Sequence, residues 1–195
     1  MTRNANPDLP NQILEQARHI VVTEGHHKLN MRDLAARVGV SATAIYHYFE
    51  NKEELLFQLK IRAAELLNSR IRSIGTGLDP MEILHRLGKE YIGFAEEQPN
   101  LYRLLFETPV GEGPYSEDEH PVIYFTYYTA RRALEQLAER GLVGHDPRYG
   151  AMMGWIMLHG FCSLVQYGNL QLVEGMNKED LKELFISFYT KGGKP

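Results

Sequence analysis

The sequence predicts an all-α protein of about nine helices, and three observations support this fold class. Apolar residues recur at steps of three and four, as on one face of an α-helix, and no run alternates with a period of two. Residues that cap helix N-termini precede several of these apolar runs. Glycine and proline separate the runs, and the chain has neither internal repeats nor low-complexity tracts.

The predicted first helix carries apolar residues at helical spacing, namely Ile13, Leu14, Ala17, Ile20 and Val21. Gly25 is expected to end it. Three short helices should follow, capped by Asn30, Ser41 and Asn51, because side-chain oxygens at these positions accept bonds from the first free backbone N–H groups. Acidic residues three positions after Asn30 and Asn51 strengthen two of these assignments.

The third short helix should continue as a long amphipathic helix that ends at Gly75 and Gly77. The elements expected after it are a helix from Asp79-Pro80 to about Gln98, a shorter one from Pro99 through Phe106, a loop at 107–118, a helix over about 119–140 closed by Gly141, a helix opened by Asp146-Pro147, and a last helix capped by Asn177 with Asp180.

Length and composition are those of an ordinary globular protein, since 44% of the residues are hydrophobic and 24% are charged. One cysteine, Cys162, cannot form an internal disulfide, and the first residues lack the apolar core of a secretory signal, so a cytoplasmic location is expected. The net charge of −4 argues against a polybasic nucleic-acid coat. The acidic excess lies after residue 62, so the N-terminal part is the better candidate for contact with a polyanion.

Residues 31–50 predict a helix-turn-helix. Four apolar residues can close a small core between its two helices: Leu34, Val38, Val40 and Ile45. Ala35 is small where the helices cross, and Gly39 stands where a tight turn needs a positive φ. A helix can enter the major groove of DNA when a second helix braces it in this way. The alternative is a three-helix bundle whose surface tyrosines pack on a neighbouring protein.

The second helix of the motif is predicted over about Ala42 to Tyr48, with short hydroxyl and methyl groups and two tyrosines facing outward. Such groups suit base edges and phosphates respectively. Lys52 adds a positive charge at the next helix start. The candidate DNA-binding residues are Asn30, Arg32, Ser41, Thr43, Ala44, Tyr46, His47, Tyr48 and Lys52.

The stretch from Ile13 to Leu56 resembles the N-terminal domain of TetR-family transcriptional regulators. The strongest match is Gly39-Val40-Ser41, followed by Ile45-Tyr46-His47-Tyr48-Phe49 and Asn51-Lys52-Glu53-Glu54-Leu55. The resemblance implies phosphate contacts for Tyr46 and Lys52, and base contacts for the variable positions Thr43, Ala44 and His47. Tyr48 replaces a frequent histidine, and Asn30 a frequent threonine. Residues 9–56 are then the DNA-binding domain, and residues 57–195 a ligand-binding and dimerisation domain.

The 25 residues from Tyr149 to Val173 contain no Asp, Glu, Lys or Arg. A membrane-spanning helix is the alternative that length allows, but the polar side chains and glycines of the run favour a helix buried by its own domain and a partner. The resemblance implies a homodimer formed by the last two helices, about 147–170 and 177–190. The candidate interface residues are Gly150, Gly154, Leu181, Leu184, Phe185 and Phe188. Trp155 with His159-Gly160 also resembles a Trp…His-Gly motif of one TetR subgroup.

Aromatic and methionine residues of the middle and C-terminal regions predict a mostly apolar cavity, with ordinary core packing as the alternative for each of them. The candidate ligand-binding residues are Tyr102, Phe106, Tyr124, Phe125, Tyr128, Met152, Trp155 and His159. The resemblance implies a small apolar or amphipathic effector there. Its binding would move the recognition helices away from adjacent grooves.

No catalytic, metal or cofactor motif is found: the histidines do not pair with a glutamate on one helix, and no glycine-rich phosphate loop follows a strand. Two alternatives remain, an all-helical enzyme using the cavity and an interaction module that has lost DNA binding. A basic rim of Lys28, Arg32, Arg37 and Lys52 disfavours the second. The sequence therefore predicts a dimeric, ligand-responsive DNA-binding regulator, a repressor rather than an activator, acting on an inverted-repeat operator.

Overall fold

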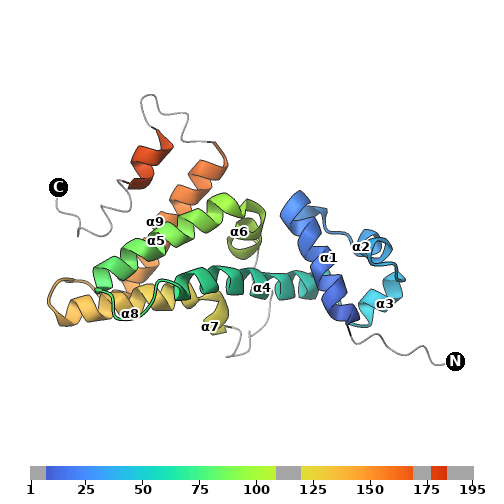
Figure 1. Ribbon diagram of the computed structural model, residues 1–195, viewed down its shortest axis with the longest axis horizontal. Helices are drawn as coiled ribbons and strands as arrows, with labels where there is room; N and C mark the ends of the chain where they lie inside the picture. Colours follow the sequence, from blue (N-terminus) through green and yellow to red (C-terminus); the bar gives the residue numbers. More distant parts are fainter. Residues whose placement is uncertain (1–7, 109–119, 169–176, 184–195) are drawn as a thin grey trace. The chain divides into compact units, whose positions relative to one another are not determined.

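The computed structural model describes residues 8–108, 120–168 and 177–183, and within these ranges all regular structure is helical. This confirms the predicted fold class. The α-helices of the described ranges are α1 (Leu9–Glu24), α2 (Met31–Val38), α3 (Ala42–Tyr46), α4 (Lys52–Arg72), α5 (Pro80–Glu97), α6 (Pro99–Phe106), α7 (His120–Ile123), α8 (Phe125–Glu139) and α9 (Pro147–Gln166), with a short 3₁₀ helix η1 (His26–Lys28) (Figure 1). Residues 178–183 are helical as well.

The helix starts follow the predicted caps. The Asn30 side chain accepts bonds from two backbone N–H groups of α2, and the Ser41 hydroxyl accepts one from Ala44 in α3 at 3.2 Å. The Asn51 side chain accepts from the Glu54 N–H at 2.7 Å, and Asp146 accepts from the Arg148 N–H at 2.9 Å. Each bond satisfies a donor that has no partner within its own helix.

The helix predicted over 119–140 is wrong in one respect, because it is two helices that break at Tyr124. The buried Asn68 side chain of α4 donates to the Val122 carbonyl at 2.8 Å. This bond comes from outside the helix and lies at the turn where α7 ends. The ring of Tyr124, the residue between the two helices, lies edge-on to the Trp155 ring, with ring centroids 5.9 Å apart.

The first of two compact units contains residues 1–64 and 98–115. Its core is built from α1, α2, α3, the start of α4, and α6, and its buried apolar residues include Ile13, Ala17, Ile20, Leu34, Ile45, Phe49, Leu55, Leu59, Tyr102 and Leu104. Two bonds hold α6 and the residues after it in this unit: Asn100 donates to the Val22 carbonyl at 2.9 Å, and Lys60 donates to the Thr108 carbonyl at 3.1 Å. The predicted domain boundary between residues 56 and 57 falls inside α4 and stays a prediction.

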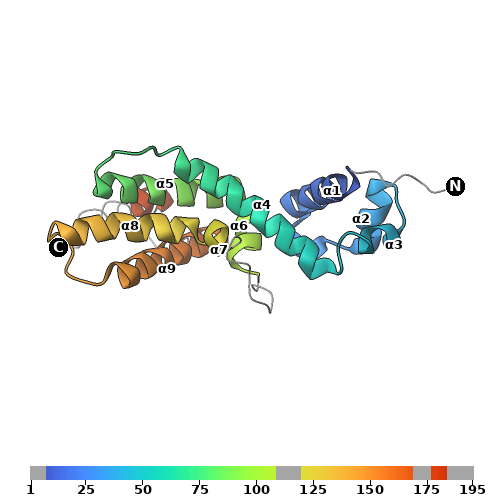
Figure 2. The same cartoon turned by 90° about the horizontal axis from the view of Figure 1, so that it is seen from below.

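The second unit contains residues 65–97 and 116–195. Its helices α5, α8 and α9 pack against one another in pairs (Figure 2). The C-terminal end of α5 is tied to the rest of the unit, because Glu96 pairs with Lys178 and with Lys182 and the Ala95 carbonyl accepts a bond from Gln166. Among the residues described, no helix combines the length and apolar character that crossing a membrane requires.

Candidate functional site

The turn before α3 is fixed by the backbone. Gly39 has φ 78°, a left-handed conformation in which side chains are strained, and the Val40 N–H donates to the Ala35 carbonyl at 3.0 Å. Ala35 is 3% exposed, so α3 lies close to α2 at this point. The glycine and the small residue thus have the roles that the sequence predicted.

Helix α3 has one buried face and one exposed face. Ile45 is fully buried, and its carbonyl accepts bonds from the N–H groups of Tyr48 and Phe49. Of the predicted core residues, Leu34 and Ile45 are buried, whereas Val38 and Val40 are half-buried. The helix ends at Tyr46, two residues earlier than predicted. Ile45 therefore fixes the rotation of α3 about its axis.

The predicted DNA-contacting side chains belong to α2, to α3, to the residues next to these helices and to the first residue of α4. Thr43 and His47 are exposed, Tyr46 is 50% exposed, and Lys52 is the first residue of α4. The His47 ring lies edge-on to the half-buried Tyr48, with centroids 5.2 Å apart. The other predicted residues of this group, Asn30, Arg32, Ser41 and Ala44, are exposed or half-buried.

Charges on this unit are partly compensated. Arg37, predicted for the basic rim, forms an ion pair with Glu24 at 2.9 Å between Nη2 and Oε1, whereas Arg32 is exposed at the first turn of α2. Lys60 is 2% exposed, and burial lowers its pKa to about 8. Burial also lowers the pKa of His26, and the charges of His27, Lys52 and Lys60 lower it further. Sequence patterns did not identify Lys60, because a lysine in an amphipathic helix usually lies on its exposed face.

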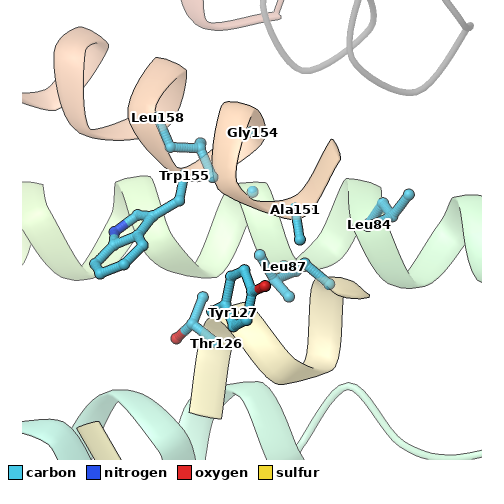
Figure 3. Close-up of a pocket in the computed structure, with 10 residues that line it drawn as sticks. Leu84, Leu87, Thr126, Tyr127, Ala151, Gly154, Trp155 and Leu158 are labelled. Atoms are coloured by element: carbon cyan, nitrogen blue, oxygen red, sulfur yellow. The ribbon is translucent and has the colours of Figure 1, made fainter. Parts of the chain in front are cut away.

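The second unit contains a small internal cavity between α5, α8 and α9 (Figure 3). Its volume is about 20 Å³, room for a single water molecule. The wall is almost wholly apolar and is formed by Leu84, Leu87, Gly88, Thr126, Tyr127, Ala130, Ala151, Gly154, Trp155 and Leu158. The Trp155 indole donates to the hydroxyl of the fully buried Tyr91 at 3.1 Å, which fixes one side of the wall.

The predicted ligand-binding residues lie in several places. Trp155 lines the internal cavity, and Tyr124 packs against it. Phe125 lies under the Arg72 guanidinium at 5.0 Å, His159 is half-buried, and Tyr128 and Met152 are at least 40% exposed. Tyr102 and Phe106 belong to the first unit, where their rings contact each other. Sequence reasoning missed most of the wall, because Leu, Ala and Gly at helical spacing look like ordinary core.

Helix α9 exposes one apolar stripe along its length. Its members recur at helical spacing and are Tyr149, Met152, Met153, Ile156 and Leu164, followed by Tyr167 just after the helix, each at least 40% exposed. Of the predicted interface residues, Gly154 lies on the opposite, buried side, and a Cβ on Gly150 would meet Leu134 of α8 at 3.1 Å. Leu181 is half-buried in the helical stretch 178–183, and Leu184, Phe185 and Phe188 lie outside the described residues.

Two sequence models of protein families match this chain. Residues 13–59 match the one described as bacterial regulatory proteins, tetR family, and residues 84–188 match the tetracyclin repressor-like C-terminal domain. An HTH-type transcriptional regulator of Mycobacterium tuberculosis is 24% identical over 80% of this chain and 69% of its own length. Matches to seven further curated relatives cover between 34% and 54% of those proteins.

Solved structures show the same fold. A protein of unknown function from Rhodococcus superposes with a TM-score of 0.79 over 98% of both chains at 18% identity. The regulator FadR of Bacillus subtilis, solved in complex with stearoyl-CoA, superposes with a TM-score of 0.68 over 94% of this chain and 98% of its own at 17% identity.

Proposed function

Because this chain belongs to the TetR family of bacterial regulatory proteins, we propose that it is a repressor that binds an inverted-repeat operator as a homodimer and releases it when a small effector binds. One observation carries the proposal: the capped helix α3 is held by the buried Ile45 and turns Thr43, Tyr46 and His47 to solvent. A short helix with this support is the element that DNA-binding helix-turn-helix proteins insert into the major groove.

The contacts divide into positioning and sequence-reading groups. Tyr46 and Lys52 bind phosphates, as do Asn30, Arg32, Ser41 and Tyr48 around them. Thr43, Ala44 and His47 contact base edges, since short hydroxyl and methyl groups and an imidazole fit the donor and acceptor pattern of the major groove. Phosphate contacts supply affinity, and base contacts supply sequence preference.

The exposed stripe of α9 supports a dimer interface. Exposed apolar side chains in a continuous row are costly in water, and a second copy related by a two-fold axis covers the same stripe on both chains. Two recognition helices then read two half-sites, which a single α3 of five residues could not do with useful specificity. Leu181 and the helix predicted to 190 extend this interface.

The effector binds where α5, α8 and α9 meet. A cavity of about 20 Å³ holds no effector in the present conformation, so binding must move these helices apart. The apolar wall selects an apolar or amphipathic molecule, and an acyl thioester is the class that the stearoyl-CoA complex of the Bacillus subtilis relative suggests. Trp155 lines this cavity, and membership of the subgroup with the Trp155…His159-Gly160 motif is part of the proposal. Coupling is reciprocal, so operator DNA weakens effector binding by the same factor.

Selection of duplexes from a randomised DNA pool by the purified protein tests this function. We expect enrichment of an inverted repeat with the wild-type chain and none with Tyr46→Ala, whose exposed side chain can be removed without disturbing the core. Circular dichroism of both proteins checks that the variant is folded. Absence of enrichment by the wild-type protein at low salt, with and without a panel of acyl-CoA esters, would contradict the proposal.

A further inference from the structure

A hydrogen bond beside the internal cavity joins two of the helices that enclose it. The indole N–H of Trp155 in α9 donates to the hydroxyl of Tyr91 in α5 at 3.1 Å. Trp155 lies at one end of the labelled cavity wall and Leu84 at the other (Figure 3). The bond therefore fixes the distance between α5 and α9 next to one end of the cavity.

Tyr91 acts on the cavity through Trp155. It lies one helical turn along α5 from Leu87 and Gly88, which line the cavity, but it is not itself part of the wall. Its side chain is fully buried. A ligand in the cavity therefore meets the indole, whose position the Tyr91 hydroxyl helps to set.

The other residues that α5 and α9 present to each other along the cavity are small or aliphatic. A Cβ on Gly88 would make only an ordinary contact, 3.9 Å from the end of the Leu158 side chain. Gly154 lines the cavity from α9. Such residues allow the helices to lie close together but bring no side-chain hydrogen bond. The bond between Trp155 and Tyr91 adds a directional contact at this place.

The C-terminal end of α5 has separate anchors. Gln166 donates to the Ala95 carbonyl at 3.2 Å, and Glu96 forms ion pairs with two lysines of the helical stretch 178–183. Gln166 is about two helical turns beyond Leu158, the last wall residue of α9. Helix α5 can therefore pivot about this anchored end when the cavity widens, and the bond to the indole lies between the pivot and the cavity.

Widening of the cavity loads this bond. A volume of about 20 Å³ has to increase before an effector can enter, and the bond joins two of the helices that must separate. The Tyr91 hydroxyl is buried, so water does not readily replace the indole as its partner. The bond therefore stabilises the closed cavity and opposes effector binding.

We propose that Tyr91 is a positioning residue of the effector site, whose bond to Trp155 holds α5 and α9 in the closed arrangement and breaks when the effector binds. This inference rests on the proposed function, because it takes the internal cavity as the effector site. Its consequence is specific: removal of the Tyr91 hydroxyl should strengthen effector binding, whereas damage to the site would weaken it.

Tyr91→Phe is the test variant, because it keeps the buried ring and removes only the hydroxyl. Its affinity for stearoyl-CoA, measured by isothermal titration calorimetry, should rise about fivefold. The stearoyl-CoA concentration that releases operator DNA should fall by the same factor. Ser69→Ala is the matched control. It removes an exposed hydroxyl of α4 that donates to the Leu66 carbonyl, and it should bind stearoyl-CoA as the wild type does.

A second pair of variants tests the bond itself. In a Trp155→Phe background, Tyr91→Phe should leave the affinity for stearoyl-CoA unchanged, because the donor of the bond is already absent. An equal gain in both backgrounds would overturn the proposal. Unchanged or weaker binding by the single variant Tyr91→Phe would overturn it as well.

Tryptophan fluorescence gives a measurement that requires neither effector nor DNA, because Trp155 is the one tryptophan of the chain. Quenching by acrylamide should be stronger in Tyr91→Phe than in the wild type and in Ser69→Ala, since the indole is held less firmly. Unchanged quenching would overturn the proposal. If quenching increases but stearoyl-CoA binds neither protein, the effector class of the proposed function is wrong and the role of the bond is supported.

Discussion

Helix α3 belongs to the proposed DNA interface and helix α9 to the proposed dimer interface. The two helices are held in place in different ways. Helix α3 has five residues and is held by signals next to it in the chain: the Ser41 cap, the turn at Gly39 and one buried residue, Ile45. Helix α9 has 20 residues and is held by packing against α5 and α8. In the first case local sequence determines which side is exposed, and in the second case distant helices do.

The difference matters for function because each unit exposes a different kind of surface. The first unit exposes hydroxyl, imidazole and amino groups on a rigid scaffold, which suits recognition of a polar polymer. The second exposes apolar side chains along α9 and contains a small apolar cavity, which suits self-association and binding of apolar ligands. Variants that affect one unit and spare the other therefore test the division directly.

The largest effect is expected from Ile156→Glu. Ile156 is 55% exposed in the middle of the α9 stripe, so a carboxylate there leaves the monomer folded but places two charges in the proposed dimer interface. The variant should be monomeric by sedimentation, and its operator affinity should fall about a hundredfold or more because half of the base contacts are lost. Leu66→Glu is the matched control, and a dimeric Ile156→Glu protein would refute the interface.

Leu34→Ala should destabilise the first unit by about 2–5 kcal/mol, because Leu34 is fully buried between α2 and its neighbours and its removal leaves a cavity. Urea unfolding followed by fluorescence and circular dichroism measures the change. Leu66→Ala, at a 40% exposed position of the second unit, should cost less than about 1 kcal/mol. Equal losses in the two variants would mean that the assigned core of the first unit is wrong.

Gly39→Ala and Gly93→Ala should change the free energy of unfolding in opposite directions. Gly39 has φ 78° and a Cβ there meets no neighbour, so backbone strain alone should cost about 1–2 kcal/mol. Gly93 lies inside helix α5, and a Cβ there would make an ordinary 3.8 Å contact with the Glu97 side chain. Alanine should therefore raise the free energy of unfolding by about 0.5–1 kcal/mol. Thermal unfolding gives both values, and a stabilising Gly39→Ala would contradict the turn.

Lys60 should make stability depend on pH in the alkaline range. Burial lowers its pKa from 10.5 to about 8, so between these values the unfolded chain holds a proton that the folded chain has lost. The free energy of unfolding should therefore rise as the pH increases from about 8 to 10.5. Lys60→Met should lack this rise, and an unchanged pH profile in the variant would show that Lys60 keeps its ordinary pKa when folded.

The smallest effects separate phosphate contacts from base contacts. Lys52→Ala should weaken binding to all duplexes alike and lower the slope of log affinity against log salt by about one charge. Thr43→Val or His47→Ala should instead change which duplexes are preferred and leave the salt slope unchanged. If Lys52→Ala changed sequence preference at constant slope, the assignment of positioning and reading residues would be wrong.

Much of the first unit could be predicted from the sequence, because its structure depends on short-range chemistry. Asn30, Ser41 and Asn51 cap their helices through bonds to residues two or three positions away, and Gly39 adopts the conformation its place requires. The exception was the buried Lys60, whose amino group donates to the Thr108 carbonyl far along the chain.

The sites of the second unit could not be predicted in this way. Helix α9 is apolar on most sides, so its pattern does not distinguish the buried Ala151 and Leu158 from the exposed Met153 and Ile156. The cavity wall consists mainly of small and aliphatic residues, whereas the prediction chose aromatic ones. The Val122 carbonyl at the end of α7 accepts a bond from Asn68, which is 54 residues away in the sequence. Long-range packing decides each of these features.

Hydroxyl-radical footprinting of the wild-type protein on the selected duplex tests the central claim most directly. We expect two protected tracts on one face of the duplex, related by a dyad and separated by one helical turn or a multiple of it, because two α3 helices are held by one dimer axis. Ile156→Glu should lose this paired protection. A single protected tract, or protection unaffected by Tyr46→Ala, would contradict the assignment of α3 as the DNA-reading element of a dimer.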